Sequence, residues 1–270
     1  MTQATMALVS GFIQGLTEFL PISSSGHLVL FQQYAGMAEP PLAYDVLLHL
    51  ATMAATILFF FREIMDACSE WFSGFVKKRF RQTHGWVLGW AVIAGNAATV
   101  VVALLLKNGV ERLFASSACV GDALFVTAAV LWYGSTLKAG RERISLSRGL
   151  LVGFVQGLAV VPGISRSGVT IIAGQRTGLE PEEAFRFSFF MSLPAIGGAT
   201  VLQLLEFGGL GGFVGQLPQA WIAGFLLSFF SGLVSLWILK KVVLAKKWRW
   251  FSVYCAVAGT LAILGSWNGG

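Results

Sequence analysis

Apolar residues in this chain are gathered into runs of about 20, the length that an α-helix needs to cross the roughly 30 Å hydrocarbon core of a bilayer. Of the 270 residues, 56% are hydrophobic and only 12% are charged. Soluble domains carry roughly twice that charged share. Membrane-spanning barrels are built instead from alternating segments of about 10 residues. The sequence therefore predicts an all-α polytopic membrane protein and excludes a soluble globular domain.

Six segments are long enough to be transmembrane helices: residues 41–61, 86–106, 118–137, 182–205, 219–239 and 250–267. Two further segments, 4–37 and 149–177, are apolar for about 15 residues, break at a cluster of Pro, Ser and Gly, and resume for about 10 more. Irregular backbone at membrane depth is tolerated only where it is buried in protein or lines a wet cavity. We predict that both are re-entrant helix-loop-helix hairpins, within a single membrane domain over residues 1–270.

The two breaks are copies of one element. Residues 14–16 and 22–26 recur 142 positions later as residues 156–158 and 164–168, with seven of eight positions identical. Each copy is followed by three predicted spans, so the half 1–137 and the half 148–270 should have opposite orientations. This is the inverted-topology repeat of many transporters, in which broken helices meet near the midplane and form the site.

The distribution of basic residues supports the same topology. Sixteen of the 19 Lys and Arg residues fall in loops that the repeat places on one side, and short loops rich in these residues stay cytoplasmic. Only Lys107 and Arg112 fall on the other side, while Arg166 lies inside the second hairpin. Both termini are therefore predicted to be extracytoplasmic. The net charge of +6 reflects this topology, so no nucleic-acid partner is expected.

Polar residues at the two breaks predict an anion site. Helices should restart near His27 and near Ser167, and helix N-termini bind anions because unpaired N–H donors and the positive end of the dipole coincide there. The planar guanidinium of Arg166 suits bidentate phosphate contact. Serine runs commonly only cap helices, but the repetition of this run beside charged residues favours a site. The expected phosphate-binding residues are Gln14, Ser23, Ser25, Ser165, Ser167, Gly168 and Thr170.

Glu18 and His27 indicate chemistry beyond anion binding. A carboxylate repels a phosphate unless it holds a divalent cation or acts as a base, and histidine can shuttle a proton near neutral pH. The alternative is that Glu18 only pairs with Arg166 and that His27 is a hydrogen-bonded interior residue. Asp45 and His49, four residues apart on one helix face, could support the site or form a structural pair at a helix end.

The two motifs resemble the signatures of a known family. Residues 14–27 read QGLTEFLPISSSGH and look like the first signature of the undecaprenyl-diphosphate phosphatase family of the bacitracin-resistance type; residues 162–170, PGISRSGVT, look like its second. The resemblance implies a hydrolase of the bacterial cytoplasmic (inner) membrane that removes the terminal phosphate of a C55 polyprenyl diphosphate. This regenerates the monophosphate carrier for cell-wall glycan synthesis. It also implies a divalent cation, Mg²⁺ or Ca²⁺, held by Glu18 and by Gln14, where the family has Glu or Gln.

We expect Glu18, Ser24, His27 and Arg166 to be the catalytic residues. Ser24 is the expected nucleophile, because it is the repeat equivalent of Arg166 and precedes His27 by three residues, although a water could attack instead. Two other functions stay open. One is a polyprenyl-phosphate transporter or flippase, alone or in the same protein. The other is an acid-phosphatase type of lipid phosphatase, suggested by Ser-Gly-His at 25–27 but without that type's other signatures. The sequence allows a homodimer.

Overall fold

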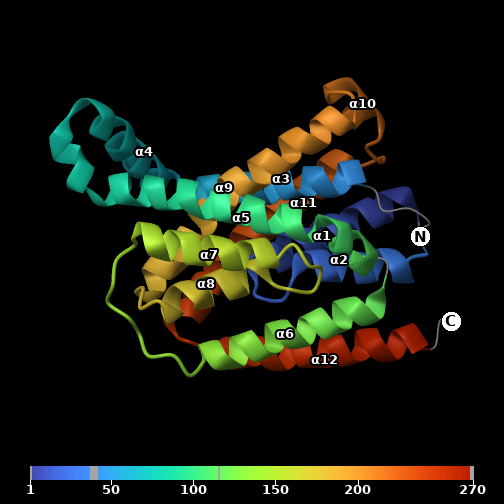
Figure 1. Ribbon diagram of the computed structural model, residues 1–270. Coiled ribbons are helices and arrows are strands. Elements are labelled where there is room, and N and C mark those ends of the chain that lie inside the picture. Colours follow the sequence, from blue (N-terminus) through green and yellow to red (C-terminus); the bar gives the residue numbers. More distant parts are fainter. Residues whose placement is uncertain (1, 37–41, 115, 268–270) are drawn as a thin grey trace.

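A computed structural model describes residues 2–36, 42–114 and 116–267 (Figure 1). Within these ranges every regular element is a helix, so the predicted all-α class is confirmed. The first half contains α1 (Gln3–Phe19), α2 (Ser24–Tyr34), α3 (Leu42–Phe59), α4 (Phe61–Val76), a 3-10 turn at Lys78–Gln82, α5 (His84–Phe114) and α6 (Ser117–Gly134). The second contains α7 (Leu146–Leu158), α8 (Arg166–Arg176), α9 (Pro181–Glu206), α10 (Leu210–Gly215), α11 (Trp221–Leu244) and α12 (Trp248–Trp267).

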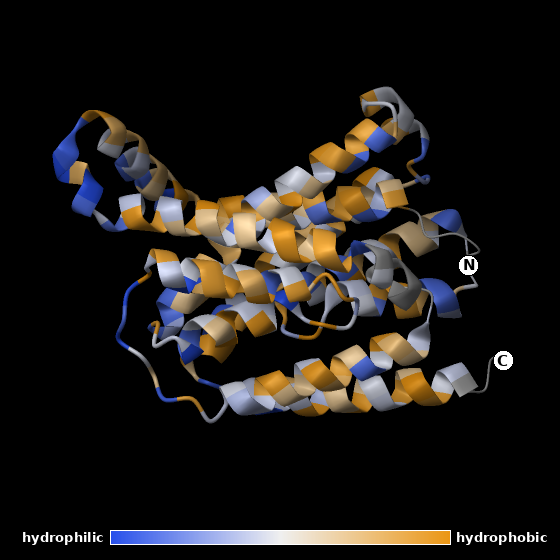
Figure 2. Ribbon diagram, viewed as in Figure 1, coloured by the Kyte–Doolittle hydropathy of each residue, from blue (hydrophilic) through white to orange (hydrophobic). Residues whose placement is uncertain are grey.

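The described helices include five that are long and apolar enough to cross a membrane: Leu42–Phe59, His84–Lys107, Ser117–Gly134, Pro181–Glu206 and Trp221–Leu244. They coincide with the first five predicted spans. The sixth predicted span lies in α12, a helix of 20 residues, and the count of six stays a prediction. Large apolar side chains such as Leu105 of α5 and Leu261 of α12 are exposed. Figure 2 shows that hydrophobic residues predominate along most of the helices. Such surfaces belong in lipid, since a water-soluble protein would aggregate through them.

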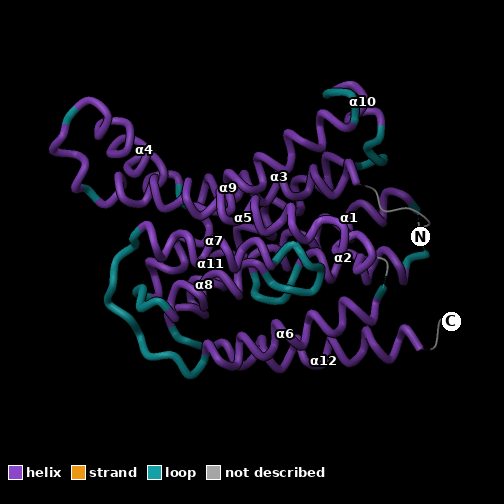
Figure 3. Tube along the Cα trace, in the orientation of Figure 1, coloured by secondary structure: helices purple, strands orange, loops and turns teal. Residues whose placement is uncertain are grey.

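Each predicted hairpin is a pair of helices interrupted by a short break, and the two breaks lie near the centre of the molecule (Figure 3). In the first hairpin α1 ends at Phe19 and α2 begins at Ser24; in the second α7 ends at Leu158 and α8 begins at Arg166. The helix after the first break therefore starts three residues before His27, the predicted restart. The cause is the Ser23 side chain, which caps α2 by accepting a hydrogen bond from the third residue of that helix.

The helices pack in pairs that follow the repeat. α1 lies along α11, its equivalent α7 lies along α5, and α6 lies beside α12 (Figure 1). Glycines allow this close approach: a β-carbon at Gly15 would lie 2.3 Å from the carbonyl oxygen of Ser228, and one at Gly157 would lie 2.5 Å from Cβ of Val102. Small residues have this role between membrane helices generally. The opposite orientation of the halves across a bilayer stays a prediction.

Aromatic packing fixes the C-terminal end of α1, which lies at the first break. Phe19, the last residue of α1, packs edge-to-face on Phe189 of α9 with ring centroids 5.5 Å apart. Phe185 and Phe60 extend the same buried cluster, at centroid distances of 5.0 and 5.9 Å from Phe189. Because Phe19 is held in this way, the preceding residue, Glu18, has a fixed position relative to α9 and to the second break.

Candidate active site

A cavity of about 890 Å³ lies where the two breaks meet. Its polar side chains come from the two hairpins and from α3, and they include Glu18, Ser24, Ser25, Gln32, Asp45, His49, Gln156, Ser165 and Arg166. Its apolar lining comes from α2, α3, the second break and the part of α9 that follows Pro194, and it includes Leu42, Val46, Ala195, Ile196 and Ala199. One cavity therefore offers a charged surface to a polar group and an apolar surface to a hydrocarbon group.

The two breaks touch directly. The backbone N–H of Gly163 donates to Oγ of Ser23 at 3.0 Å, and Thr127 of α6 donates to the carbonyl of Gly163 at 2.8 Å. Gly163 has φ +99° and Ser23 has φ +69°, the latter a strained value for a residue with a side chain. A β-carbon at Gly26 would lie 3.1 Å from Cα of Gly163. The Ser23 hydroxyl also accepts a hydrogen bond from Gly26 N–H at 3.3 Å. This one hydroxyl therefore bonds both to the start of α2 and to the second break.

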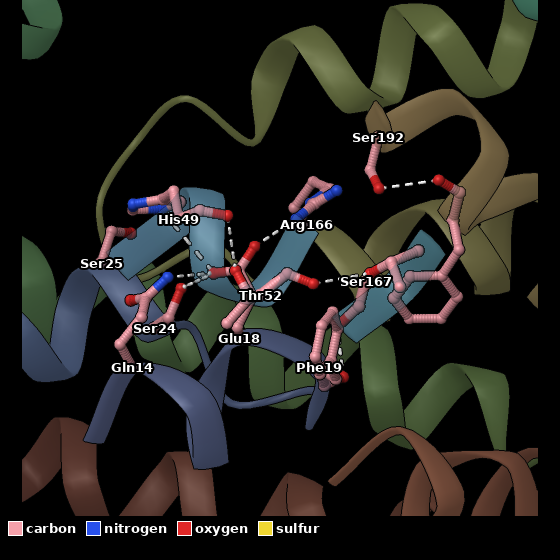
Figure 4. A network of polar contacts seen from close by, with 12 residues as sticks. Gln14, Glu18, Phe19, Ser24, Ser25, His49, Thr52, Arg166, Ser167 and Ser192 are labelled. Carbon is pink, nitrogen blue, oxygen red and sulfur yellow. Dashed lines mark hydrogen bonds and ion pairs between the residues drawn. The ribbon is translucent and has the colours of Figure 1, made fainter. Parts of the chain in front are cut away.

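Glu18 is the centre of the polar network in Figure 4. One carboxylate oxygen, Oε1, accepts a hydrogen bond from Arg166 of the second break. The other, Oε2, accepts from Ser24 Oγ at 2.5 Å and from the Gln14 amide nitrogen at 3.0 Å, and it lies 3.8 Å from Nε2 of His49. The Glu18 side chain is 3% exposed, whereas Arg166 is 19% exposed and faces the cavity. The fold thus brings together Glu18, Ser24 and Arg166, three of the four residues expected to be catalytic.

His27, the fourth, lies elsewhere. Its Nδ1 bonds with the carbonyl of Ser23 at 2.8 Å, and its Nε2 bonds with the hydroxyl of Tyr254 on α12 at 2.8 Å. The two rings stack with centroids 5.7 Å apart. His27 does not line the cavity, and the hydrogen-bonded interior residue is the interpretation that its contacts support. The histidine that lines the cavity is His49.

Three of the residues expected to bind phosphate, Ser23, Ser25 and Ser165, line the cavity. Ser165 caps α8 by accepting a hydrogen bond from Gly168 N–H at 3.2 Å, as Ser23 caps α2. The first turns of α2 and α8 therefore both begin at the cavity, and the first N–H groups of a helix have no carbonyl partner within it. Two positive helix ends and the Arg166 guanidinium converge on one space, which is favourable for an anion.

Ser167 and Thr170, also expected to bind phosphate, are buried among other partners. Ser167 donates to the carbonyl of Phe19 at 2.9 Å, which ties the start of α8 to the end of α1. Thr170 donates to the carbonyl of Arg166 at 2.7 Å and lies 2.6 Å from Oγ of Ser188. Neither side chain lines the cavity, so their contacts position the second break.

The two predicted cation ligands, Glu18 and Gln14, differ in the atoms that they present to each other. Gln14 turns its amide nitrogen, a donor, toward Glu18, and its Oε1 is buried with no hydrogen-bond partner in the described ranges. In this arrangement the nitrogen of the Gln14 amide, and not its oxygen, lies beside Glu18. Asp45 lies in the same cavity, and Nε2 of Gln32 contacts both of its oxygens, at 3.0 and 3.2 Å. Carboxylate oxygens are the ligands that Mg²⁺ and Ca²⁺ prefer, and Glu18 and Asp45 are the carboxylates that line the cavity. Among the described residues, no three His, Cys, Asp or Glu side chains form a metal-binding group.

Other polar residues of the site were not singled out from the sequence. Thr127 holds the second break, and Gln156, the repeat equivalent of Gln14, donates to Thr99 Oγ1 at 3.2 Å on the cavity wall. The sequence signal of Thr127 is only a polar residue within an apolar segment, whereas Gln156 belongs to the repeated motif.

Broken helices that bring a carboxylate, a hydroxyl and a guanidinium to one partly apolar cavity define an integral membrane protein with a charged intramembrane site. The chain belongs to the bacitracin resistance protein BacA family, whose model matches residues 7–261. This confirms the resemblance of the two motifs.

Similar proteins span nearly the whole chain. A protein of Desulforapulum autotrophicum is 42% identical, covering 95% of this chain and 96% of its own length. One from Methanosphaera stadtmanae is 36% identical and covers 98% of both chains. One from Desulfosudis oleivorans is 39% identical and covers 95% and 96%. All three are named undecaprenyl-diphosphatase.

Proposed function

We propose that this protein is an integral membrane undecaprenyl-diphosphatase, which hydrolyses the lipid diphosphate to its monophosphate and inorganic phosphate. The observation that carries the proposal is the convergence of Glu18, Ser24 and Arg166 on one cavity, in a chain that matches named undecaprenyl-diphosphatases from end to end. The relatives' names describe a hydrolase and give no support to a transporter or flippase.

Ser24 is the proposed nucleophile. Its Oγ forms a bond to the terminal phosphorus, the bond from that phosphorus to the bridging oxygen breaks, and the lipid monophosphate leaves with the electron pair. The hydroxyl proton passes to Oε2 of Glu18, which already accepts that hydrogen bond at 2.5 Å. A base within hydrogen-bond reach of the nucleophile is the usual arrangement for covalent catalysis. Water then hydrolyses the phosphoserine and releases inorganic phosphate.

Arg166 is the proposed phosphate clamp. It pairs with Glu18 in the free protein, and its partly exposed guanidinium lies at the first residue of α8, beside the helix N-terminus. A diphosphate entering the cavity would take over donors of the guanidinium and accept hydrogen bonds from the first turns of α2 and α8. Such preorganised donors stabilise the charge that develops on a phosphoryl group during transfer.

A divalent cation, Mg²⁺ or Ca²⁺, is proposed to bind with the substrate, with Glu18 and Asp45 as its carboxylates. The ion would neutralise part of the negative charge that the diphosphate adds to a cavity already holding two acidic side chains. Gln32, whose amide contacts both oxygens of Asp45, would orient that carboxylate toward the ion.

We further propose that both termini are extracytoplasmic and that the protein lies in the cytoplasmic membrane. The basic α4–α5 turn and the α6–α7 loop lie at one end of the molecule, and both termini lie at the other (Figures 1 and 2). This separation agrees with the loop-charge rule. The first hairpin would then enter from outside and the second from the cytoplasm. A homodimer stays a prediction.

Phosphate release from a C55 polyprenyl diphosphate by purified protein in detergent tests the activity. We expect Ser24→Ala to abolish turnover, because no other hydroxyl contacts Glu18 in the part of the chain that the structure describes. Ser147→Ala is the matched control, since Ser147 is exposed in the first turn of α7 and outside the cavity. Normal turnover by Ser24→Ala would assign the attack to water, and binding without phosphate release would refute the enzymatic function.

A further inference from the structure

Hydrolysis of a phosphoserine requires a base for the attacking water, and the network around Glu18 does not provide one. Both Glu18 oxygens are occupied, Oε1 by Arg166 and Oε2 by Ser24 and Gln14. After the first step Glu18 also carries the proton of Ser24, which it must return to Oγ as that oxygen leaves phosphorus. A second proton acceptor is therefore needed, with a free lone pair and access to water.

We propose that His49 is this acceptor, the catalytic base of the second, hydrolytic step. The inference rests on the proposed phosphoserine at Ser24. His49 lies on α3, lines the cavity, and keeps 34% of its side chain exposed there, so water reaches it. Of the three histidines, it alone lies in the cavity: both nitrogens of His27 are engaged, and His84 lies 3.3 Å from Glu183 at the start of α5.

The hydrogen bond of the other ring nitrogen sets the tautomer of His49. Nδ1 lies 2.8 Å from the backbone carbonyl of Asp45, one helical turn earlier. A carbonyl oxygen can only accept, so Nδ1 carries the hydrogen and Nε2 of the neutral ring holds a lone pair. The hydrogen bond to α3 also fixes the ring, as the orienting group of a catalytic base does.

Nε2 of His49 lies beside the groups that react. Nε2 lies 3.8 Å from Oε2 of Glu18, too far for a hydrogen bond, and that oxygen is the one to which Ser24 donates at 2.5 Å. Nε2 of His49 and Oγ of Ser24 thus lie beside the same oxygen of Glu18, and both residues line the cavity. A water in the cavity that donates to Nε2 would stand next to a phosphoryl group on Oγ.

In the proposed step His49 is the base for hydrolysis of the phosphoserine. The water oxygen forms a bond to phosphorus while the bond from phosphorus to Oγ of Ser24 breaks. One water proton goes to Nε2 of His49, Glu18 returns its proton to Oγ, and His49 then releases its proton to water in the cavity. Inorganic phosphate and the free serine result.

His49→Asn tests the proposal, because the asparagine amide can keep the bond to the Asp45 carbonyl while removing the base at Nε2. With a polyprenyl diphosphate labelled in its terminal phosphate, rapid quenching follows lipid monophosphate, inorganic phosphate and labelled protein. We expect a first turnover of lipid monophosphate at the wild-type rate, labelled protein that accumulates at Ser24, and a steady-state rate lower by about 10²- to 10⁴-fold, the usual contribution of a general base. His84→Asn, the matched control, should show none of these changes.

The outcomes separate the two proposals. If His49→Asn slows the first turnover and the steady state equally, with no labelled protein, His49 only supports the structure and the inference is wrong. If it turns over at the wild-type rate, the base lies elsewhere. If the wild type and the variant both hydrolyse the lipid but neither labels Ser24 under any quench, the phosphoserine of the proposed function fails first, and the inference fails with it.

Discussion

Replacement of Arg166 should affect stability and catalysis separately, and both effects can be estimated from its contact with Glu18. The Glu18 side chain is 3% exposed, and Arg166 is the only cation that donates a hydrogen bond to it among the described residues. Removing one partner of a buried ion pair leaves an uncompensated charge and costs about 3–5 kcal/mol of folding stability. Loss of a donor to the developing charge costs a further 10²- to 10³-fold or so in turnover.

Two variants distinguish these effects. Arg166→Ala should lower both the unfolding temperature and phosphate release. The double variant Glu18→Gln/Arg166→Ala places a neutral amide where the uncompensated carboxylate would lie, so we expect most of the stability to return while turnover stays lost. Unfolding of each purified protein in detergent can be followed by tryptophan fluorescence, and turnover by release of inorganic phosphate from a polyprenyl diphosphate.

Two results would refute this reasoning. An Arg166→Ala protein that keeps more than about a tenth of normal turnover would mean that the phosphate is not clamped at α8. A double variant no more stable than Arg166→Ala would mean that the charge of Glu18 is compensated by something other than Arg166. Arg166→Lys, which keeps the charge but loses the planar fork, should give an intermediate turnover.

Further predictions concern topology, the cation and the apolar wall. A cysteine at Gly211 should react with an impermeant reagent in intact cells and one at Lys78 only after lysis; the reverse pattern would overturn the proposed orientation. Excess EDTA should abolish turnover and Mg²⁺ restore it, with Asp45→Asn raising the Mg²⁺ concentration needed for half activity; full turnover in EDTA would remove the cation from the mechanism. Ala199→Phe should obstruct the cavity wall and slow a C55 substrate about tenfold more than a short soluble diphosphate, by analogy with the modest selectivity of apolar pockets; equal slowing would place the hydrocarbon chain elsewhere.

The meeting of the two breaks was predictable from the sequence, because both breaks are copies of one repeated motif. Glu18 and Arg166 are 148 positions apart, yet two copies of one motif, predicted to have opposite orientations, were expected to approach a common centre. The contact between Glu18 and Arg166 confirms that approach. The five spans found by length and composition were predictable for a simple reason, since lipid requires long apolar helices.

The direction of individual side chains was not predictable. Whether His27 points into the cavity depends on where α2 begins, and that start depends on the positive φ of Ser23, which is stabilised by a bond from Gly163 in the other half. His49 was singled out only by its spacing of four residues from Asp45, as a residue that could support the site or form a structural pair at a helix end. Its approach to Glu18 requires the packing of α3 beside α1, which a linear pattern does not contain.

The crossing of the two breaks at Gly163 and Ser23 has a consequence for biogenesis. Each half of the chain supplies only part of the proposed machinery, the carboxylate and hydroxyl from one and the guanidinium from the other, and the halves are joined where their loops touch. A chain in which one half inserts correctly and the other does not would have a normal helical spectrum for the inserted part and no catalysis at all. Turnover is therefore expected only from chains in which both halves have inserted correctly. Phosphate release can accordingly serve as an assay of complete membrane insertion.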